Sequence, residues 1–123
     1  MTKNYSSNME INKLTGIAIG AVIEVHKELG PGLLESVYEE CLCLELESRE
    51  IPFKRQLDIP IEYKGQVINS KLRIDMLITD RLILELKSCE KVLPIHEAQI
   101  LTYLRLSNIS TGLLINSNHR PPT

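Results

Sequence analysis

Two short segments in the middle of the chain alternate in side-chain polarity on either side of a three-residue turn. They are residues 72–78 and 82–87, and Thr79-Asp80-Arg81 separates them. Because side chains alternate between the two faces of a β-strand, the pattern predicts an antiparallel hairpin with one apolar face. This hairpin is the feature that most constrains the fold. The residues expected on its apolar face are Ile74, Met76, Ile78, Leu82, Leu84 and Leu86.

The other face of the hairpin is expected to carry Asp75, Glu85 and Lys87 towards solvent. The turn sets Ile78 opposite Leu82 and therefore Asp75 opposite Glu85. Like charges directly opposite each other destabilise an antiparallel pair by roughly 0.2–1 kcal/mol. A bound divalent cation would offset that repulsion, and two carboxylates beside a lysine suit Mg²⁺. The alternative is a solvated face, on which Asp75 is an exposed charge and Glu85 pairs with Lys87.

The composition indicates one ordinary globular domain. The chain has 123 residues, no tryptophan and one phenylalanine, so a single, largely aliphatic core is expected. A formal net charge of -2 does not favour a nucleic-acid binder of the basic-patch kind. The longest apolar stretch, residues 17–23, is too short to cross a bilayer, so no membrane partner is expected.

The cysteines favour a reducing, cytoplasmic compartment. Cys41, Cys43 and Cys89 are odd in number, and no signal peptide precedes them. Cys41 and Cys43 lie two residues apart in an expected helix, so they point to nearly opposite sides and cannot form a zinc pair. We expect both to be small residues of the core or its boundary.

Helical spacing and helix-stop residues predict three helices. The first is expected to start near Ser7, which has capping-box spacing to Glu10, and to stop at Gly30-Pro31-Gly32. The second is expected over residues 33–49 and the third over residues 94–106. The residues expected to be buried are Ile11, Leu14, Ala18, Ala21, Val22 and Val25 in the first helix, Leu34, Val37, Cys41 and Leu44 in the second, and Ala98, Leu101 and Leu104 in the third.

The order of elements predicts an α/β fold with one mixed sheet. Strands are expected over residues 53–62, in the two arms of the hairpin, and over residues 109–116. Two N-terminal helices then precede a three-stranded antiparallel meander, a crossover helix and a fourth strand parallel to the third. Residues 1–8 are expected to form a flexible leader, 9–117 a single domain and 118–123 a frayed tail.

Several segments together resemble the GxxExxY protein family. Gly32-Leu33-Leu34-Glu35-Ser36-Val37-Tyr38 matches the motif that names it, and Arg73-Ile74-Asp75 with Leu84-Glu85-Leu86-Lys87 resembles its acidic strand pair. Residues 25–32, 59–65, 98–106 and 112–116 extend the resemblance over residues 12–116. The family is grouped with the PD-(D/E)XK nuclease-like superfamily, whose restriction-endonuclease-like core agrees with the predicted order of elements.

The resemblance implies a role for each residue that matches the family pattern. It makes Asp75 and Glu85 ligands of Mg²⁺ or Mn²⁺, and Lys87 the cation that positions or activates the attacking water. It also adds Glu35 as a carboxylate from the early helix that joins the metal site. These four residues form the expected catalytic set.

Three further residues are candidates for substrate binding, and each has a structural alternative. Gln99 and Tyr103 match a Q-x-x-x-Y pattern that some nuclease branches use near the site, but as i,i+4 neighbours they could instead hydrogen-bond within the fold. Tyr38 lies one turn after Glu35 and could share its face, although a tyrosine at the core edge is the commoner case. Glu35 itself would occupy a favourable capping position if Gly32 were the N-cap.

The resemblance therefore implies a Mg²⁺-dependent nuclease-like domain that hydrolyses phosphodiester bonds in DNA or RNA. The alternative is a non-catalytic module on the same scaffold that binds nucleic acid or a protein. Its support is the small size and slightly acidic charge of the chain. A homodimer that completes the site is a further expectation, because so small a domain offers little surface to a substrate.

Overall fold

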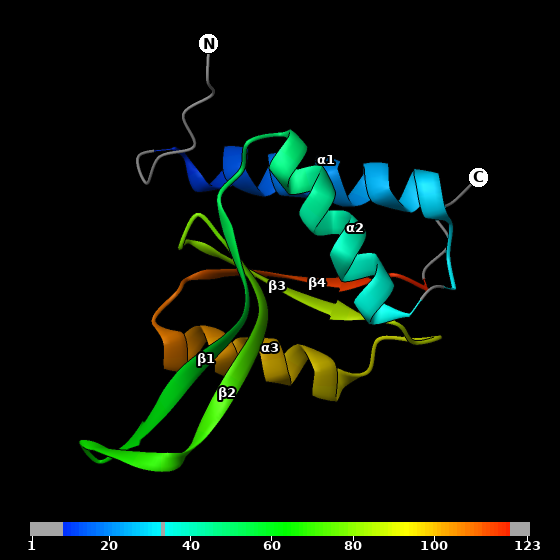
Figure 1. Ribbon diagram of the computed structural model, residues 1–123. Coiled ribbons are helices and arrows are strands. Elements are labelled where there is room, and N and C mark those ends of the chain that lie inside the picture. The colour runs from blue at the N-terminus through cyan, green and yellow to red at the C-terminus, as the bar shows by residue number, and fades with distance from the viewer. Residues whose placement is uncertain (1–8, 33, 119–123) are drawn as a thin grey trace.

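A computed structural model of the chain describes residues 9–32 and 34–118 and shows a four-stranded sheet between helices (Figure 1). The sheet has the order β1-β2-β3-β4, in which β3 and β4 are parallel and the other neighbours antiparallel. The predicted α/β fold is thereby confirmed. The elements are α1 (Ile11–Leu29), α2 (Glu35–Ser48), β1 (Phe53–Tyr63), β2 (Gln66–Ile78), β3 (Leu82–Lys87), α3 (Pro94–Ser107) and β4 (Thr111–Asn116).

The structure confirms the predicted C-terminal end of α1 but not its predicted N-terminal end. The helix stops at Gly30, whose φ of 73° is readily adopted by a residue without a Cβ. It begins at Ile11 and not near Ser7, because Glu10 has an extended backbone and makes no side-chain cap. Ser7 and the expected leader, residues 1–8, lie outside the described residues, as do residues 119–123 of the expected tail.

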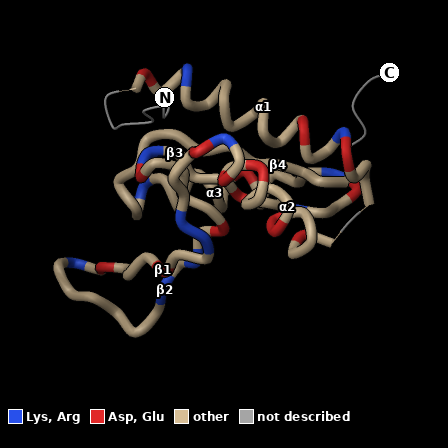
Figure 2. Tube along the Cα trace, turned by 45° about the horizontal axis from the view of Figure 1, so that its top comes forward, with Lys and Arg blue, Asp and Glu red and all other residues tan. Residues whose placement is uncertain are grey.

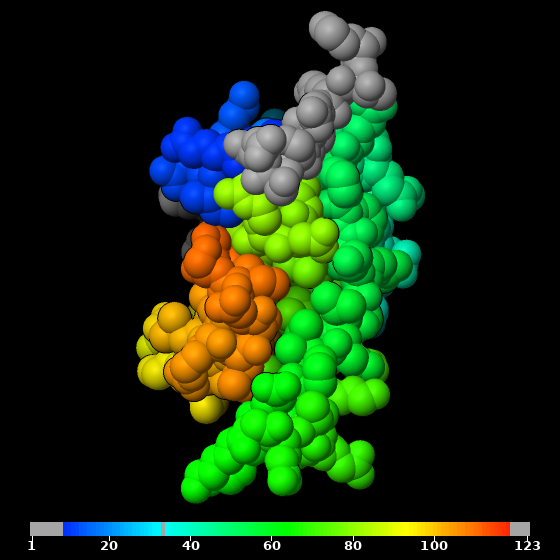
Figure 3. Space-filling view, turned by 90° about the vertical axis from the view of Figure 1, so that its left-hand side faces the viewer, coloured from blue at the N-terminus to red at the C-terminus, as the bar shows by residue number. Residues whose placement is uncertain are grey.

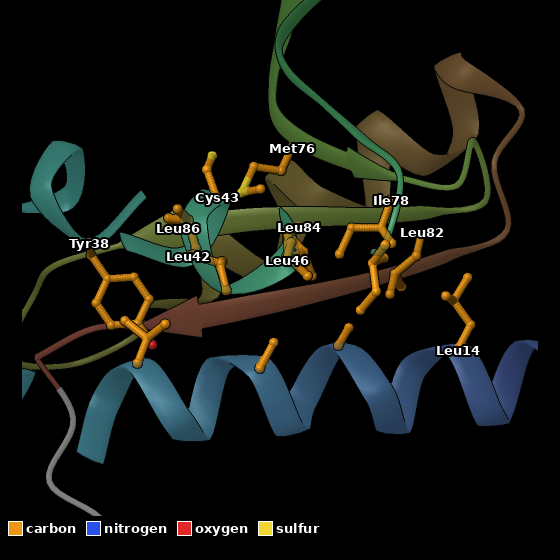
Figure 4. Packing of buried hydrophobic residues seen from close by; sticks show 14 residues of the cluster. Leu14, Tyr38, Leu42, Cys43, Leu46, Met76, Ile78, Leu82, Leu84 and Leu86 are labelled. Atoms are coloured by element: carbon orange, nitrogen blue, oxygen red, sulfur yellow. The ribbon is translucent and has the colours of Figure 1, made fainter. Parts of the chain in front are cut away.

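The main core lies between the sheet and the two N-terminal helices (Figure 4). The predicted stripe of α1 is confirmed: four of its residues are buried, and Ile11 and Val22 pack partly buried beside them. Fully burying one aliphatic side chain stabilises a fold by roughly 1.5–3 kcal/mol. The buried residues of α1 are Leu14, Ala18, Ala21 and Val25, and those of β2 and β3 in this core are Met76, Ile78, Leu82, Leu84 and Leu86.

The predicted stripe of α2 is wrong, because apolar residues occur all around this helix and helical spacing fits two stripes equally well. Leu34, Val37 and Leu44 are exposed, and Cys41 is half-buried. The side chains that α2 does bury are Tyr38, Glu39, Leu42, Cys43 and Leu46. Similarly, α3 buries Ile100, while Ala98 and Leu101 are exposed and Leu104 is half-buried.

A second, smaller cluster lies on the opposite face of the sheet, beneath α3. It contains Ile74, Leu77 and Ile83, with Leu104 of α3 packed against them. The prediction that Ile74 shares a face with Met76 is therefore wrong. The side chains of β2 alternate regularly after Met76, but the alternation breaks at the residue between Ile74 and Met76.

Strands β1 and β2 continue beyond the rest of the sheet as a two-stranded arm (Figures 1 and 3). Their register shifts between Pro60 and Glu62. The arm ends in the predicted turn at Lys64 and Gly65, both of which have positive φ. Among the described residues, no helix combines the length and apolar character needed to cross a membrane.

Candidate active site

The ladder between β2 and β3 contains only three residue pairs and opens at the two acids. The last pair is Met76–Leu84, and the predicted partners Asp75 and Glu85 are the next residues of the two strands, one position beyond the ladder. There, side-chain oxygens take the place of backbone acceptors. Glu85 Oε1 accepts the N–H of Asp75 at 3.2 Å, and Asp75 Oδ2 accepts the N–H of Leu86 at 2.7 Å. The open end of the strand pair therefore holds the two carboxylates side by side.

Glu85 is buried, with only 4% of its surface exposed, and not solvated as its hairpin face was expected to be. The difference arises because α3 covers this face of the sheet. Burial and, second to it, the neighbouring charge of Asp75 raise the pKa of Glu85 to about 8. Hydrogen bonding to the backbone of Asp75 and the charge of Lys87 act in the opposite direction. The site therefore holds a carboxyl group that ionises reluctantly.

Lys87 ends β3 on the same side of the strand as Glu85. Its side chain is half-buried, and its positive charge lowers the pKa of Glu85. None of the ion pairs within residues 9–32 and 34–118 involves Lys87. The surface pair with Glu85 considered from the sequence is therefore not formed, and the lysine lies near the acids without being neutralised by one of them.

Glu35 is the first residue of α2 and approaches the site from the other side of a cavity. Leu34 is the N-cap, so Glu35 does not occupy the capping position expected if Gly32 were the cap. Its Oε1 instead accepts the N–H of Ser88 at 2.9 Å, directly after β3. Glu35 and Asp75 line the same cavity of about 370 Å³. The structure thus brings three of the expected carboxylates to one region. Figure 2 shows several acidic positions around α2 and the adjacent sheet.

Glu39, Arg55 and Gln56 were not singled out in the sequence, yet they adjoin the acids. Glu39 is 7% exposed and lines the cavity with Gln56. Its Oε1 accepts the side-chain amide of Gln56 at 2.8 Å, and its Oε2 accepts Nε and Nη2 of Arg55 at 3.1 and 2.7 Å. The available signal was the i,i+4 spacing of Glu39 from Glu35, which places both on one helix face.

Gln99 and Tyr103 of α3 form the hydrogen bond that their spacing allows, with 2.9 Å between Gln99 Nε2 and the Tyr103 hydroxyl. Both line a second cavity, of about 550 Å³, together with Leu72 of β2. Burial raises the pKa of Tyr103, and the charges of Glu85 and Asp75 raise it further. The pair therefore lies close enough to the acids to experience their field.

Tyr38 does not lie with the acids but in the main core. It is fully buried, and its hydroxyl donates to the backbone carbonyl of Val22 in α1 at 3.1 Å. The ring of His26 meets it edge-on, and burial raises the pKa of Tyr38 to about 12. The expectation that it contacts substrate is therefore not supported, and the structure gives Tyr38 a packing role.

The donors in this region fit a hard divalent cation better than a soft one. They are carboxylate oxygens, and each acid has lone pairs left after accepting one backbone N–H. Within the described part of the chain, no three His, Cys, Asp or Glu side chains converge closely enough to enclose a metal by themselves. Such a set suits Mg²⁺, which commonly takes one or two carboxylates and completes its shell with water and phosphate oxygen.

A family model for the PD-(D/E)XK nuclease superfamily matches residues 12–123. No curated protein and no solved structure gives a significant match to the chain. The matched range contains all four strands and every candidate site residue. The family match and the geometry therefore agree on the nuclease-like scaffold.

Proposed function

Because the chain belongs to the PD-(D/E)XK nuclease superfamily, we propose that it is a metal-dependent hydrolase of phosphodiester bonds in DNA or RNA. The observation that carries the proposal is the buried Glu85 facing Asp75 where the strand ladder opens. Keeping two carboxyl groups together in a poorly hydrated place costs stability unless a cation compensates them. Reluctant ionisation of this kind is common at functional sites.

Each acidic residue of the site has a distinct proposed role. Asp75 and Glu85 hold the cation through the lone pairs that the backbone N–H groups leave free. Glu35 faces the cavity of Asp75 from α2, and we assign its Oε2 to water bound by the cation, because the Ser88 N–H occupies its Oε1. When bound, Mg²⁺ would polarise a phosphoryl oxygen and lower the pKa of its bound water.

The remaining polar residues act on water and substrate. Lys87 lies two residues after Glu85, about 6.6–6.8 Å further along the strand, and its ammonium group orients the attacking water. Gln99 and Tyr103 present an amide and a hydroxyl from α3, and we assign them to substrate contact. Tyr103 is suited to donate, because its hydroxyl oxygen accepts the amide of Gln99 and its own hydrogen can point to a substrate.

We also infer the finer assignment to the GxxExxY family, on the sequence from Gly32 to Tyr38 and on the acidic strand pair. The three cysteines are free thiols, which is compatible with the cytoplasmic location expected from the sequence. A homodimer that enlarges the substrate surface remains a prediction, and light scattering would test it.

A cleavage assay tests the proposal directly. Supercoiled plasmid and a folded RNA are incubated with the protein in millimolar Mg²⁺ or Mn²⁺, and wild type is expected to cut at least one of them. Asp75→Asn and Glu85→Gln are expected to lower the rate by at least about 10²-fold, since each removes a group that acts on the transition state. Glu62→Gln, at an exposed acid of the arm, is the matched control and should cleave like wild type.

Two results of this assay would count against the proposal. No cleavage with either metal would rule out the proposed hydrolase activity. Undiminished cleavage by Asp75→Asn would rule out Asp75 as a residue of the active site. Binding of either nucleic acid without cleavage would favour the alternative, a non-catalytic module. That alternative further requires binding to persist when both Glu85 and Lys87 are replaced by alanine.

A further inference from the structure

Gln56 interrupts β1 with a backbone conformation that strands do not use. Its φ is 47°, in the left-handed region that is strained for residues other than glycine. The register pairs Arg55 with Met76 and Leu57 with Ile74, so Gln56 stands opposite Asp75. A strained residue thus faces one of the two candidate metal ligands.

The strained residue is anchored to α2 through Glu39. The side-chain amide of Gln56 donates to Glu39 Oε1 at 2.8 Å, and Arg55 donates twice to Oε2. Both oxygens of Glu39 are therefore engaged, and its surroundings exclude most water. This arrangement makes Glu39 a fixed anchor for β1. The other α2 carboxylate that lines the cavity is Glu35, whose Oε1 accepts the N–H of Ser88.

At Gln56 and the facing Asp75, the alternation of side chains between the two faces of the sheet reverses in both β1 and β2. The facing pair Phe53–Ile78 packs in the main core, whereas the facing pair Leu57–Ile74 packs in the second cluster. Residues four apart in a regular strand share a face, so the pleat must reverse between these two pairs. Asp75 lies at this reversal. Its side chain lines the cavity and belongs to neither of the two hydrophobic clusters.

We propose that Gln56 is a positioning residue of the candidate metal centre. Its left-handed backbone, fixed through Glu39 and Arg55, directs Asp75 into the cavity that Gln56 also lines. The inference rests on the proposed function, because Gln56 can position a metal ligand only if Asp75 is one. Gln56 acts through Asp75 and needs no contact with metal or substrate.

Replacing Gln56 with glycine tests this role without endangering the fold. Glycine accepts a φ of 47° without strain, which offsets the loss of the hydrogen bond to Glu39 Oε1, so Gln56→Gly should unfold close to the wild-type temperature. It also removes the amide and allows many other backbone conformations, so Asp75 is no longer held. Loss of such a supporting group typically weakens metal binding about 10- to 100-fold, and a reduction of about tenfold is expected for Mn²⁺ measured by calorimetry.

Two further variants separate positioning from a merely structural role. Gln56→Asn keeps an amide on a residue that tolerates the left-handed region, so it should recover most of the Mn²⁺ affinity. Lys64→Gly relieves a similar φ of 51° at the far end of the arm and should leave the affinity unchanged. A structural role alone would alter the unfolding temperature of Gln56→Gly and not its affinity.

The outcomes distinguish this inference from the proposed function. Wild-type protein that binds Mn²⁺, together with Gln56→Gly that binds it equally tightly, would overturn the positioning role and leave the hydrolase standing. Wild-type protein that binds no Mn²⁺ would overturn both. A tenfold loss in Lys64→Gly as well would show that the effect is general flexibility of the arm, which also contradicts the inference.

Discussion

The two ends of the β2–β3 strand pair differ in what their backbone N–H groups bond to and in which side chains they carry. At the end near the turn, three residue pairs form a regular ladder and all six side chains are buried and apolar. At the other end, the ladder opens and carboxylates accept the backbone N–H groups. We call these the closed end and the open end. The closed end consists of Met76, Leu77, Ile78, Leu82, Ile83 and Leu84, and the open end of Asp75, Glu85 and Leu86.

The closed end contributes to the stability of the fold, whereas the open end carries the candidate metal ligands. Aliphatic side chains of the closed end join the cores on both faces of the sheet. The open end gives up regular pairing and places Glu85 where its charge is poorly hydrated. Variants of the closed end should therefore change the free energy of unfolding, whereas variants of the open end should change metal binding and its pH dependence.

The largest stability effect is expected from truncation at the closed end. Leu84 is 0% exposed, and Leu84→Ala should lower the free energy of unfolding by about 2–5 kcal/mol, because it removes buried contacts and leaves a cavity. Urea denaturation measures the change. Leu101→Ala, at a side chain that is 61% exposed, is the control and should stay within about 0.5 kcal/mol of wild type. Equal losses in the two variants would contradict the assignment of the core.

The next effect is a gain in stability at the open end. Folding raises the pKa of Glu85 from its usual 4.5 to about 8, so between these values the folded state binds more protons than the unfolded state. The free energy of unfolding of the metal-free protein should therefore fall as pH rises through this window. Glu85→Gln stays neutral and should be more stable than wild type at pH 8, on the order of 1–3 kcal/mol. Thermal unfolding in chelator from pH 5 to 8.5 measures both, and parallel curves would refute the explanation.

Metal binding should also displace a proton from the open end. Around pH 7, Glu85 is still largely protonated in the folded protein, and a carboxyl group must ionise to serve as a ligand. Binding of Mg²⁺ should therefore release close to one proton near pH 7 and almost none near pH 9. Calorimetry in buffers of different ionisation enthalpy measures the release. A binding heat independent of the buffer at pH 7 would speak against Glu85 as a ligand.

The smallest effect is expected for an exposed ion pair beside the closed end. Lys54 Nζ lies 3.1 Å from Asp80 Oδ1, and both side chains are largely exposed. Surface pairs of this kind contribute about 0–1 kcal/mol, so Lys54→Ala should barely change stability and should leave metal affinity as in wild type. A loss comparable to that of Leu84→Ala, measured in the same urea titration, would mean that charge and not burial stabilises this end.

The sequence predicted the closed end well because local signals determine it. The turn at Thr79-Asp80-Arg81 and the alternation on either side fix the register, and the crossover connection fixes the direction of β4. The site pair Asp75 and Glu85 follows from that register. The alternation also places Lys87 on the face of Glu85. Resemblance to a known family then supplied Glu35 and the role of Lys87.

The rest could not be predicted, because contacts distant in the sequence decide it. The face of Ile74 depends on the reversal at Gln56, whose side chain is hydrogen-bonded to Glu39 of another element. The burial of Glu85 depends on how α3 covers the sheet. The wrong stripe of α2 has a simpler cause, since its apolar residues lie on all sides and only packing selects Tyr38 for the core.

The most direct test of the central claim, that Asp75 and Glu85 share one divalent cation, is a crystal structure after soaking in Mn²⁺, with anomalous scattering used to locate the ion. We expect one peak at the open end of the strand pair, with a carboxylate oxygen of each acid about 2.0–2.3 Å away, as usual for small hard cations. A map without a peak there at saturating Mn²⁺, or a peak bound by only one of the acids, would contradict the claim.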